Sequence, residues 1–85
     1  MTKDRNKFKI DLGRKISELR KSKGFKQKDL AIVLDCSLGN IGAIESGWAN
    51  PPLDKLYKIC VLFKCDIFDI IPSVKDVKQS DFNCA

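Results

Sequence analysis

Polar side chains suited to binding gather around two short helical patterns between residues 27 and 47. Lys26, Gln27 and Lys28 stand where the first pattern begins, and the N-terminus of a helix favours anions such as phosphate. Ser37 and Asn40 stand at the start of the second pattern, where the amide of Asn40 could form paired hydrogen bonds with a planar partner. The chemistry that these residues favour is the binding of phosphate and of hydrogen-bonding groups.

Catalysis and metal binding have almost no support in the sequence. It contains no histidine, no glycine-rich phosphate loop and no pair of carboxylates on one helix face, and active sites are usually built from such groups. The four cysteines include no CxxC pair, so their spacing predicts neither a zinc site nor a disulfide. Cys36, Cys60 and Cys65 fall in apolar stripes, where we expect them to pack as small hydrophobic side chains, and Cys84 is expected to be an exposed thiol. We therefore expect no enzyme, no metal and no cofactor.

Positive charge is concentrated in the first third of the chain. Residues 1–28 hold eleven Lys or Arg and three acidic residues, a net charge of +8, whereas residues 29–85 have a net charge of −3. Such a split is typical of a surface that faces phosphate, although a solvated lysine-rich helix face would have the same composition. The position of the lysines at the start of the helical patterns favours phosphate.

The two short patterns must belong to a larger helical domain. Leu30, Ala31 and Leu34 recur at helical spacing, and Ile41 and Ile44 do so again after a turn. Because isolated helices shorter than ~12–15 residues are marginal in water, the two must pack on each other and on a third element. The pattern therefore predicts a helix-turn-helix.

The whole chain is expected to be all-α, with five helices and no strand. Gly24 and Gly47 are predicted to end the first and third helices, and Pro72 the last. Asp11, Ser37 and Asp66 are candidate N-caps of the first, third and last helices, whereas Lys26 is a poor cap for the second. In the fourth helix Leu53, Leu56, Ile59, Cys60 and Phe63 are expected to face inward. The helices are predicted from somewhere in 6–11 to 23, and over 27–34, 37–46, 53 to 63 or 64, and 67–71.

Three regions are expected along the chain: a basic N-terminal arm over residues 1–9, the helix-turn-helix domain over residues 10–71, and a flexible C-terminal tail over residues 72–85. No apolar run approaches the ~20 residues that span a bilayer, and the charged N-terminus does not read as a secretory signal. We therefore expect a cytoplasmic protein with no membrane partner and no small-molecule ligand.

The ordered motifs resemble the Cro-like phage-repressor (XRE) helix-turn-helix family over residues 10–71. The resemblance implies a compact five-helix, lambda-repressor-like DNA-binding domain, usually a dimer that regulates transcription. The matching residues are Leu12-Gly13-Arg14-Lys15-Ile16-Ser17-Glu18-Leu19-Arg20, Gly24-Phe25-Lys26-Gln27, Leu30-Ala31, Ser37, Ile41, Ile44-Glu45, Gly47 and Pro51.

The same resemblance implies roles for residues of the scaffold. It pairs Arg20 with Glu45 in a largely buried ion pair between the first and third helices. Because removing one partner of such a pair typically costs ~3–5 kcal/mol, we interpret both residues as structural. Gln27 matches the family glutamine whose side chain and backbone N–H approach a phosphate, with Lys26 and Lys28 beside it.

The second helix of the motif would read the bases, and here the chain departs from the family pattern. Only Asn40 could pair with an adenine, whereas Leu38 and Ala43 could touch thymine methyl groups. Gly39 and Gly42 each cost the helix about 1 kcal/mol relative to alanine. Either the missing side chains allow an unusually close approach to DNA or a partner, or the helix merely tolerates glycine. The predicted reading positions are Leu38, Gly39 and Ala43, with Ser37, Asn40 and Gly42 beside them.

Two further surfaces are expected to take part in binding. Trp48 and Asn50, in a loop stiffened by two prolines, are candidate contacts to the DNA backbone or minor groove, although Trp48 could instead cover the edge of the core. A dimer that binds a palindrome would double the few contacts of one recognition helix. Its surface is expected in the apolar C-terminal cluster, unless Phe68 folds back onto the fourth helix. The cluster comprises Tyr57, Val61, Phe68, Ile70 and Ile71.

Three hypotheses for function follow. The leading one is a transcriptional regulator, a repressor or an autoregulating control protein, which binds a palindromic double-stranded operator as a homodimer. The second is a protein-interaction or antitoxin-like module that keeps the fold and has lost base readout. The third, an RNA-binding helical domain, is weakest because no aromatic stacking platform is visible.

Overall fold

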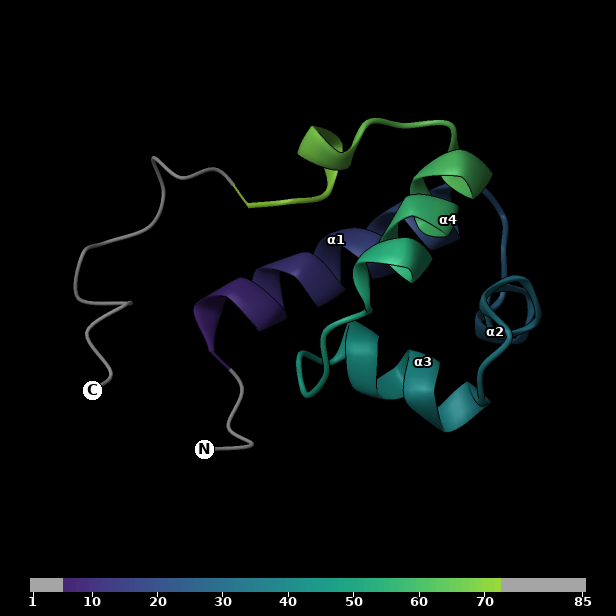
Figure 1. The fold of residues 1–85 in the computed structure, drawn as a ribbon, viewed down its shortest axis with the longest axis horizontal. Helices are drawn as coiled ribbons and strands as arrows, with labels where there is room; N and C mark the ends of the chain where they lie inside the picture. The colour runs from purple at the N-terminus through teal and green to yellow at the C-terminus, as the bar shows by residue number, and fades with distance from the viewer. Residues whose placement is uncertain (1–5, 73–85) are drawn as a thin grey trace.

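The computed structural model describes residues 6–72 and contains helices and no strand in that range (Figure 1). The predicted all-α fold is confirmed, with four α-helices and a short 3-10 helix, η1, in place of the expected fifth α-helix. Pro72 disfavours the α conformation of the residue before it, so the chain has room after Asp66 for a single tight turn. The elements are α1 (Lys7–Ser22), α2 (Gln27–Leu34), α3 (Leu38–Glu45), α4 (Leu53–Phe63) and η1 (Ile67–Asp69).

Helix α1 is the longest element, and the other helices pack around it and one another. Figure 1 shows α1 running across the domain, with α2 at the end away from the first turn of α1. Helix α3 packs against α1 and α2, and α4 packs against α2 and η1. The core lies between these elements. It is made of Leu12, Ile16, Leu30, Ala31, Leu34, Ile41, Ile44, Leu56, Ile59, Cys60, Phe63 and Ile70.

The first N-cap differs from the prediction. Asn6 caps α1, because its side-chain oxygen accepts a hydrogen bond from the Lys9 backbone N–H at 2.9 Å. Asp11, the predicted cap, instead lies within α1 and forms ion pairs with Lys7 and Arg14. Residues 7–9 of the predicted N-terminal arm are therefore the first residues of α1. Residues 1–5 of that arm and residues 73–85 of the predicted tail lie outside the described residues.

The helix-turn-helix is bounded by caps on both sides. The side chain of Lys26 does not cap α2. Instead, the Asp29 carboxylate accepts a hydrogen bond from the Lys26 backbone N–H at 2.8 Å. The Ser37 hydroxyl accepts one from the Asn40 N–H at 3.0 Å, as predicted. Gly24 and Gly47 follow α1 and α3 with φ of +81° and +89°, conformations that favour glycine.

Two expectations about α4 and the end of the chain change. Leu53 is 73% exposed, so the buried stripe of α4 begins at Leu56. At 100° per residue Leu53 lies roughly 70° away from the centre of that stripe. Asp66 precedes η1 without a side-chain cap; its own N–H donates to the Asp69 carboxylate at 2.9 Å.

One glycine of α1 permits the contact with α3. Gly13 is buried, and a Cβ atom placed on it would collide with the backbone oxygen of Ile44 and lie 2.8 Å from that of Glu45. Any other residue would therefore push α3 away from α1. Within the described part of the chain, no helix is both long and apolar enough to cross a membrane.

Candidate nucleic-acid interface

Helix α3 buries one face and presents the other. Ile41 and Ile44 are 0% and 2% exposed, so they hold the helix on the core. Leu38 is 54% exposed and Asn40 is also exposed. The predicted reading positions therefore share an accessible surface. Those that are exposed or half-buried are Ser37, Leu38, Gly39, Asn40, Gly42 and Ala43.

Nothing in the described chain requires glycine at two of these positions. A Cβ atom on Gly42 would meet no atom within 4 Å, and one on Gly39 would lie 3.9 Å from the Ser37 Oγ. Both residues also have ordinary helical backbone angles, because neither is among the residues of positive φ. The fold could accept alanine at both positions, unlike at Gly13.

The predicted buried ion pair is confirmed. Arg20 Nε donates to Glu45 Oε2 at 2.6 Å, and the two side chains are only 9% and 7% exposed. Arg20 also donates from Nη2 to Glu45 Oε1 at 3.2 Å and from Nη1 to the Phe25 backbone oxygen at 2.8 Å. Because every contact is a charge-assisted hydrogen bond, the guanidinium joins α1, α3 and the α1–α2 turn.

Gln27 is joined to the same carboxylate. Its Nε2 donates to Glu45 Oε1 at 3.0 Å, and the residue is half-buried at the first position of α2. The amide nitrogen of glutamine carries two N–H groups, so one stays available after this bond. Glu45 therefore orients the amide at the start of α2, which the sequence did not predict. Lys26 and Lys28, on either side, are exposed.

The loop after α3 is tied back to that helix. The backbone N–H groups of Trp48 and Ala49 both donate to the Ala43 oxygen, at 2.9 and 3.2 Å. Gly47 lies against α1, where an added Cβ atom would be 3.0 Å from the Ile10 Cα. Trp48 is nevertheless 53% exposed and Asn50 is exposed, on a loop that begins where α3 ends.

The predicted dimer surface is only partly accessible. Tyr57, Val61 and Phe68 are 70%, 60% and 86% exposed, so Phe68 does not fold back onto α4. Ile70 is wrong as an interface residue because it is 1% exposed, and Ile71 is half-buried against the core. The tight turn of η1 directs Ile70 inward. Tyr57 and Val61 border a groove of about 280 Å³ between α2 and α4, which is lined by Val33, Tyr57, Lys58, Val61 and Leu62.

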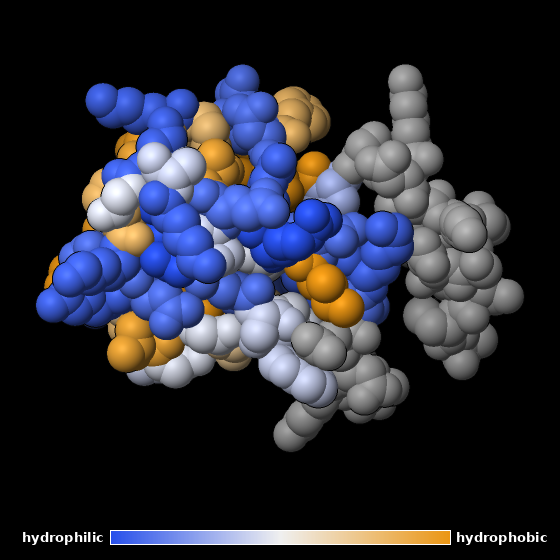
Figure 2. Space-filling view, turned by 180° about the vertical axis from the view of Figure 1, so that it is seen from behind, coloured by the Kyte–Doolittle hydropathy of each residue, from blue (hydrophilic) through white to orange (hydrophobic). Residues whose placement is uncertain are grey.

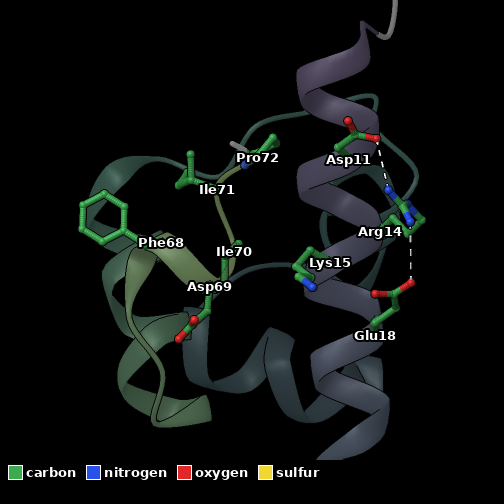
Figure 3. A pocket seen from close by; sticks show the side chains of 9 residues that line it. All are labelled: Asp11, Arg14, Lys15, Glu18, Phe68, Asp69, Ile70, Ile71 and Pro72. Atoms are coloured by element: carbon green, nitrogen blue, oxygen red, sulfur yellow. Dashed lines mark hydrogen bonds and ion pairs between the residues drawn. The ribbon is translucent and has the colours of Figure 1, made fainter. Parts of the chain in front are cut away.

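A second hollow lies between α1 and the segment after α4 (Figure 3). Figure 3 shows Asp11, Arg14 and Glu18 along α1, joined by ion pairs, and Phe68 pointing away from them. The hydrogen bond from Lys7 lowers the pKa of Asp11.

The face of the molecule opposite to the view of Figure 1 is largely hydrophilic (Figure 2). Among the described residues no cluster of His, Cys, Asp and Glu could hold a metal ion.

Comparison with known proteins points to one family. A family model described as a Cro/C1-type HTH DNA-binding domain matches residues 15–76. No curated protein sequence matches the chain.

Solved structures have the same fold. The restriction-modification controller protein C.AhdI from Aeromonas hydrophila superposes with a TM-score of 0.66 at 24% identity, over 73% of this chain and 94% of that one. The clp gene regulator ClgR from Corynebacterium glutamicum gives a TM-score of 0.71 at 21% identity, over 79% and 71%. An HTH_3 family transcriptional regulator from Vibrio cholerae gives 0.64 at 27% identity, over 74% and 35%.

Proposed function

Because this chain belongs to the Cro/C1-type helix-turn-helix DNA-binding family, we propose that it is a transcriptional regulator that binds an operator through α3. The observation that carries the proposal is the exposed face of α3 beside the N-terminus of α2, where Lys26 and Lys28 are free of the core. The helix N-terminus and the two lysines form a site for phosphate. This function places the protein in the cytoplasm and gives it no catalytic role.

The proposed readout uses few hydrogen bonds. With α3 in the major groove, Asn40 would pair with an adenine while Leu38 and Ala43 contact thymine methyl groups. Gln27 would donate its second N–H to a phosphate, held in place by Glu45. Trp48 and Asn50 would contact the backbone beside the groove. DNA shape then supplies part of the specificity.

A homodimer on a palindromic operator would double these contacts. Tyr57, Val61 and Phe68, with the apolar groove between α2 and α4, are the proposed interface. A dimer that covers a promoter would act as a repressor or as an autoregulating control protein.

The test selects bound sequences from a random duplex library and measures their affinity by fluorescence anisotropy over a range of salt concentrations. We expect an enriched A·T-containing palindrome, and a Leu38→Ala variant that discriminates less against duplexes in which the contacted thymine is replaced. Lys28→Ala should weaken binding to all sequences and reduce the salt slope by about one. Lys15→Ala, whose side chain lines the hollow of Figure 3 between α1 and the segment after α4, is the matched control and should change neither.

An alternative function is a protein-interaction or antitoxin-like module. It is favoured by the same sparse α3 surface, which has Asn40 as its only amide side chain. Equal affinity for every duplex in the library would reject sequence-specific regulation. Absence of any DNA binding, together with a stoichiometric protein partner, would favour the module.

A further inference from the structure

The turn at the end of α4 brings Cys60 and Cys65 together. Their spacing in the sequence is not that of a CxxC pair. Lys64 has φ of +55°, and the chain reverses there so that the Cys65 N–H donates to the Cys60 oxygen at 3.0 Å. The Lys64 N–H donates to the Val61 oxygen at 3.3 Å. This pair of bonds is a Schellman turn, a motif in which the side chains at the positions of Cys60 and Cys65 are frequently in contact.

The separation suits a disulfide. A hydrogen bond of 3.0 Å between the two backbones leaves their Cα atoms no more than about 7 Å apart, given standard bond lengths. A disulfide requires a Cα separation within about 7 Å. Burial and then the neighbouring Cys65 thiol raise the pKa of the Cys60 thiol, as expected of two thiols that lie close together. Both residues are present as free thiols.

We propose that Cys60 and Cys65 are a redox-sensitive pair, which hydrogen peroxide closes into a disulfide across the end of α4. The half-buried Cys65 reacts first: its thiol is oxidised to a sulfenic acid, the peroxide accepts two electrons, and water leaves. The Cys60 sulfur then attacks the Cys65 sulfur, the S–S bond forms, and a second water leaves. Both thiol protons end in water.

The surroundings decide the order of the two steps. Cys60 is 8% exposed, and its burial, with the neighbouring Cys65, raises the pKa of its thiol to about 11. Because the thiolate is the form that reacts with oxidants, Cys60 is protected from direct attack. Its reaction partner is the Cys65 sulfur across the turn, which the backbone hydrogen bond keeps nearby.

Closing the bond would fix the start of segment 66–72 on α4. That segment places Ile70 in the core and Phe68 on the surface. The disulfide would therefore slow the opening of the turns in which the Ile70 and Ile71 N–H groups donate to the Ile67 oxygen. A six-residue loop closed by a disulfide should raise Tm by about 9–18 °C.

Trypsin offers a direct test because it cleaves after Lys64, between the two cysteines. The full chain is treated with hydrogen peroxide under native conditions, blocked with iodoacetamide, denatured and digested. We expect peptides 59–64 and 65–75 to stay joined until reduced, with the mass of two hydrogen atoms lost. Oxidised protein that is neither denatured nor digested should show slower hydrogen exchange at Ile70 and Ile71, and a higher Tm.

Two variants control this experiment. Cys36→Ser should leave the joined peptides unchanged, whereas Cys65→Ser should abolish them while circular dichroism shows an unchanged helix content. The proposal is overturned if the two peptides separate without reduction, if Cys65 is found only as a sulfinic acid, or if it is joined to a second chain. The readout needs no DNA, so its outcome is independent of the proposed operator binding.

Discussion

Glycine is required at one position of this chain and is not required at two others. Gly13 lies where α1 meets the backbone of α3, and an added Cβ atom would collide with a carbonyl oxygen. Gly39 and Gly42 have open space beside them and ordinary helical angles. Within a single chain, the two glycines of α3 affect only stability. They increase the conformational entropy of the unfolded chain, which lowers the free energy of unfolding. If these two glycines have a function, it must involve a binding partner of the chain; otherwise α3 merely tolerates them.

Alanine substitutions separate these possibilities. Gly39→Ala and Gly42→Ala should each raise the free energy of unfolding by about 0.4–1 kcal/mol, measured by urea denaturation. Gly13→Ala, the matched substitution at the helix contact, should lower it. If DNA approaches the backbone of α3 closely, the two stabilised variants will bind the operator more weakly than the natural protein. Unchanged affinity would mean that the helix merely tolerates glycine.

At the scale of the elements, the position of α3 depends on its two ends. Ser37 caps its N-terminus, and Glu45 at its last position is held by Arg20 and Gln27 from α1 and α2. Ile41 and Ile44 hold it on the core between these ends. An eight-residue helix is too short to form alone, so both ends are needed to orient its exposed face.

The N-cap of α3 allows stability and binding to be altered separately. Ser37→Ala removes the acceptor for the Asn40 N–H and should lower the free energy of unfolding by about 1 kcal/mol. Ser37→Asp keeps an acceptor, and its charge suits the helix N-terminus, so stability should be retained. The added carboxylate would face phosphate, however, and operator affinity should fall. Thermal denaturation and anisotropy titration of both variants test this, and equal binding by Ser37→Asp would argue against α3 as the DNA-facing helix.

At the scale of the whole molecule, apolar side chains remain uncovered along α4 and η1. Phe68 is 86% exposed and Val61 is 60% exposed, and the groove beside Val61 is apolar. Patches of this kind mark interaction surfaces. Phe68 also lines the hollow between α1 and the segment after α4, where the α1 side carries ion pairs between Asp11, Arg14 and Glu18.

Self-association can be tested on this uncovered side. Val61→Asp combined with Phe68→Asp places charge on two exposed positions and should convert a dimer to a monomer without loss of helix content. Leu53→Asp is the control, because Leu53 is 73% exposed but lies at the other end of α4. Analytical ultracentrifugation gives the mass of each. A natural protein that stays monomeric at high concentration would rule out the proposed dimer.

The sequence by itself determined the features that depend on local chemistry. Helical spacing predicted α1 to α4, the turn at Gly24 needed a residue that tolerates positive φ, and Ser37 was recognised as a cap from its type and place. The ion pair of Arg20 and Glu45 came from the resemblance to the family and is confirmed. These features are encoded within a few residues or in a shared motif.

Only the tertiary structure decided the features that depend on which surfaces meet. Ile70 is buried and Leu53 exposed, although both are apolar residues at helical positions, because η1 turns inward and α4 begins outside the core stripe. Gly13 is required by a backbone in another helix. Cys60 and Cys65 meet because Lys64 adopts a positive φ, which no spacing rule indicates. Burial and contact are properties of the packed chain, so a pattern within one segment cannot specify them.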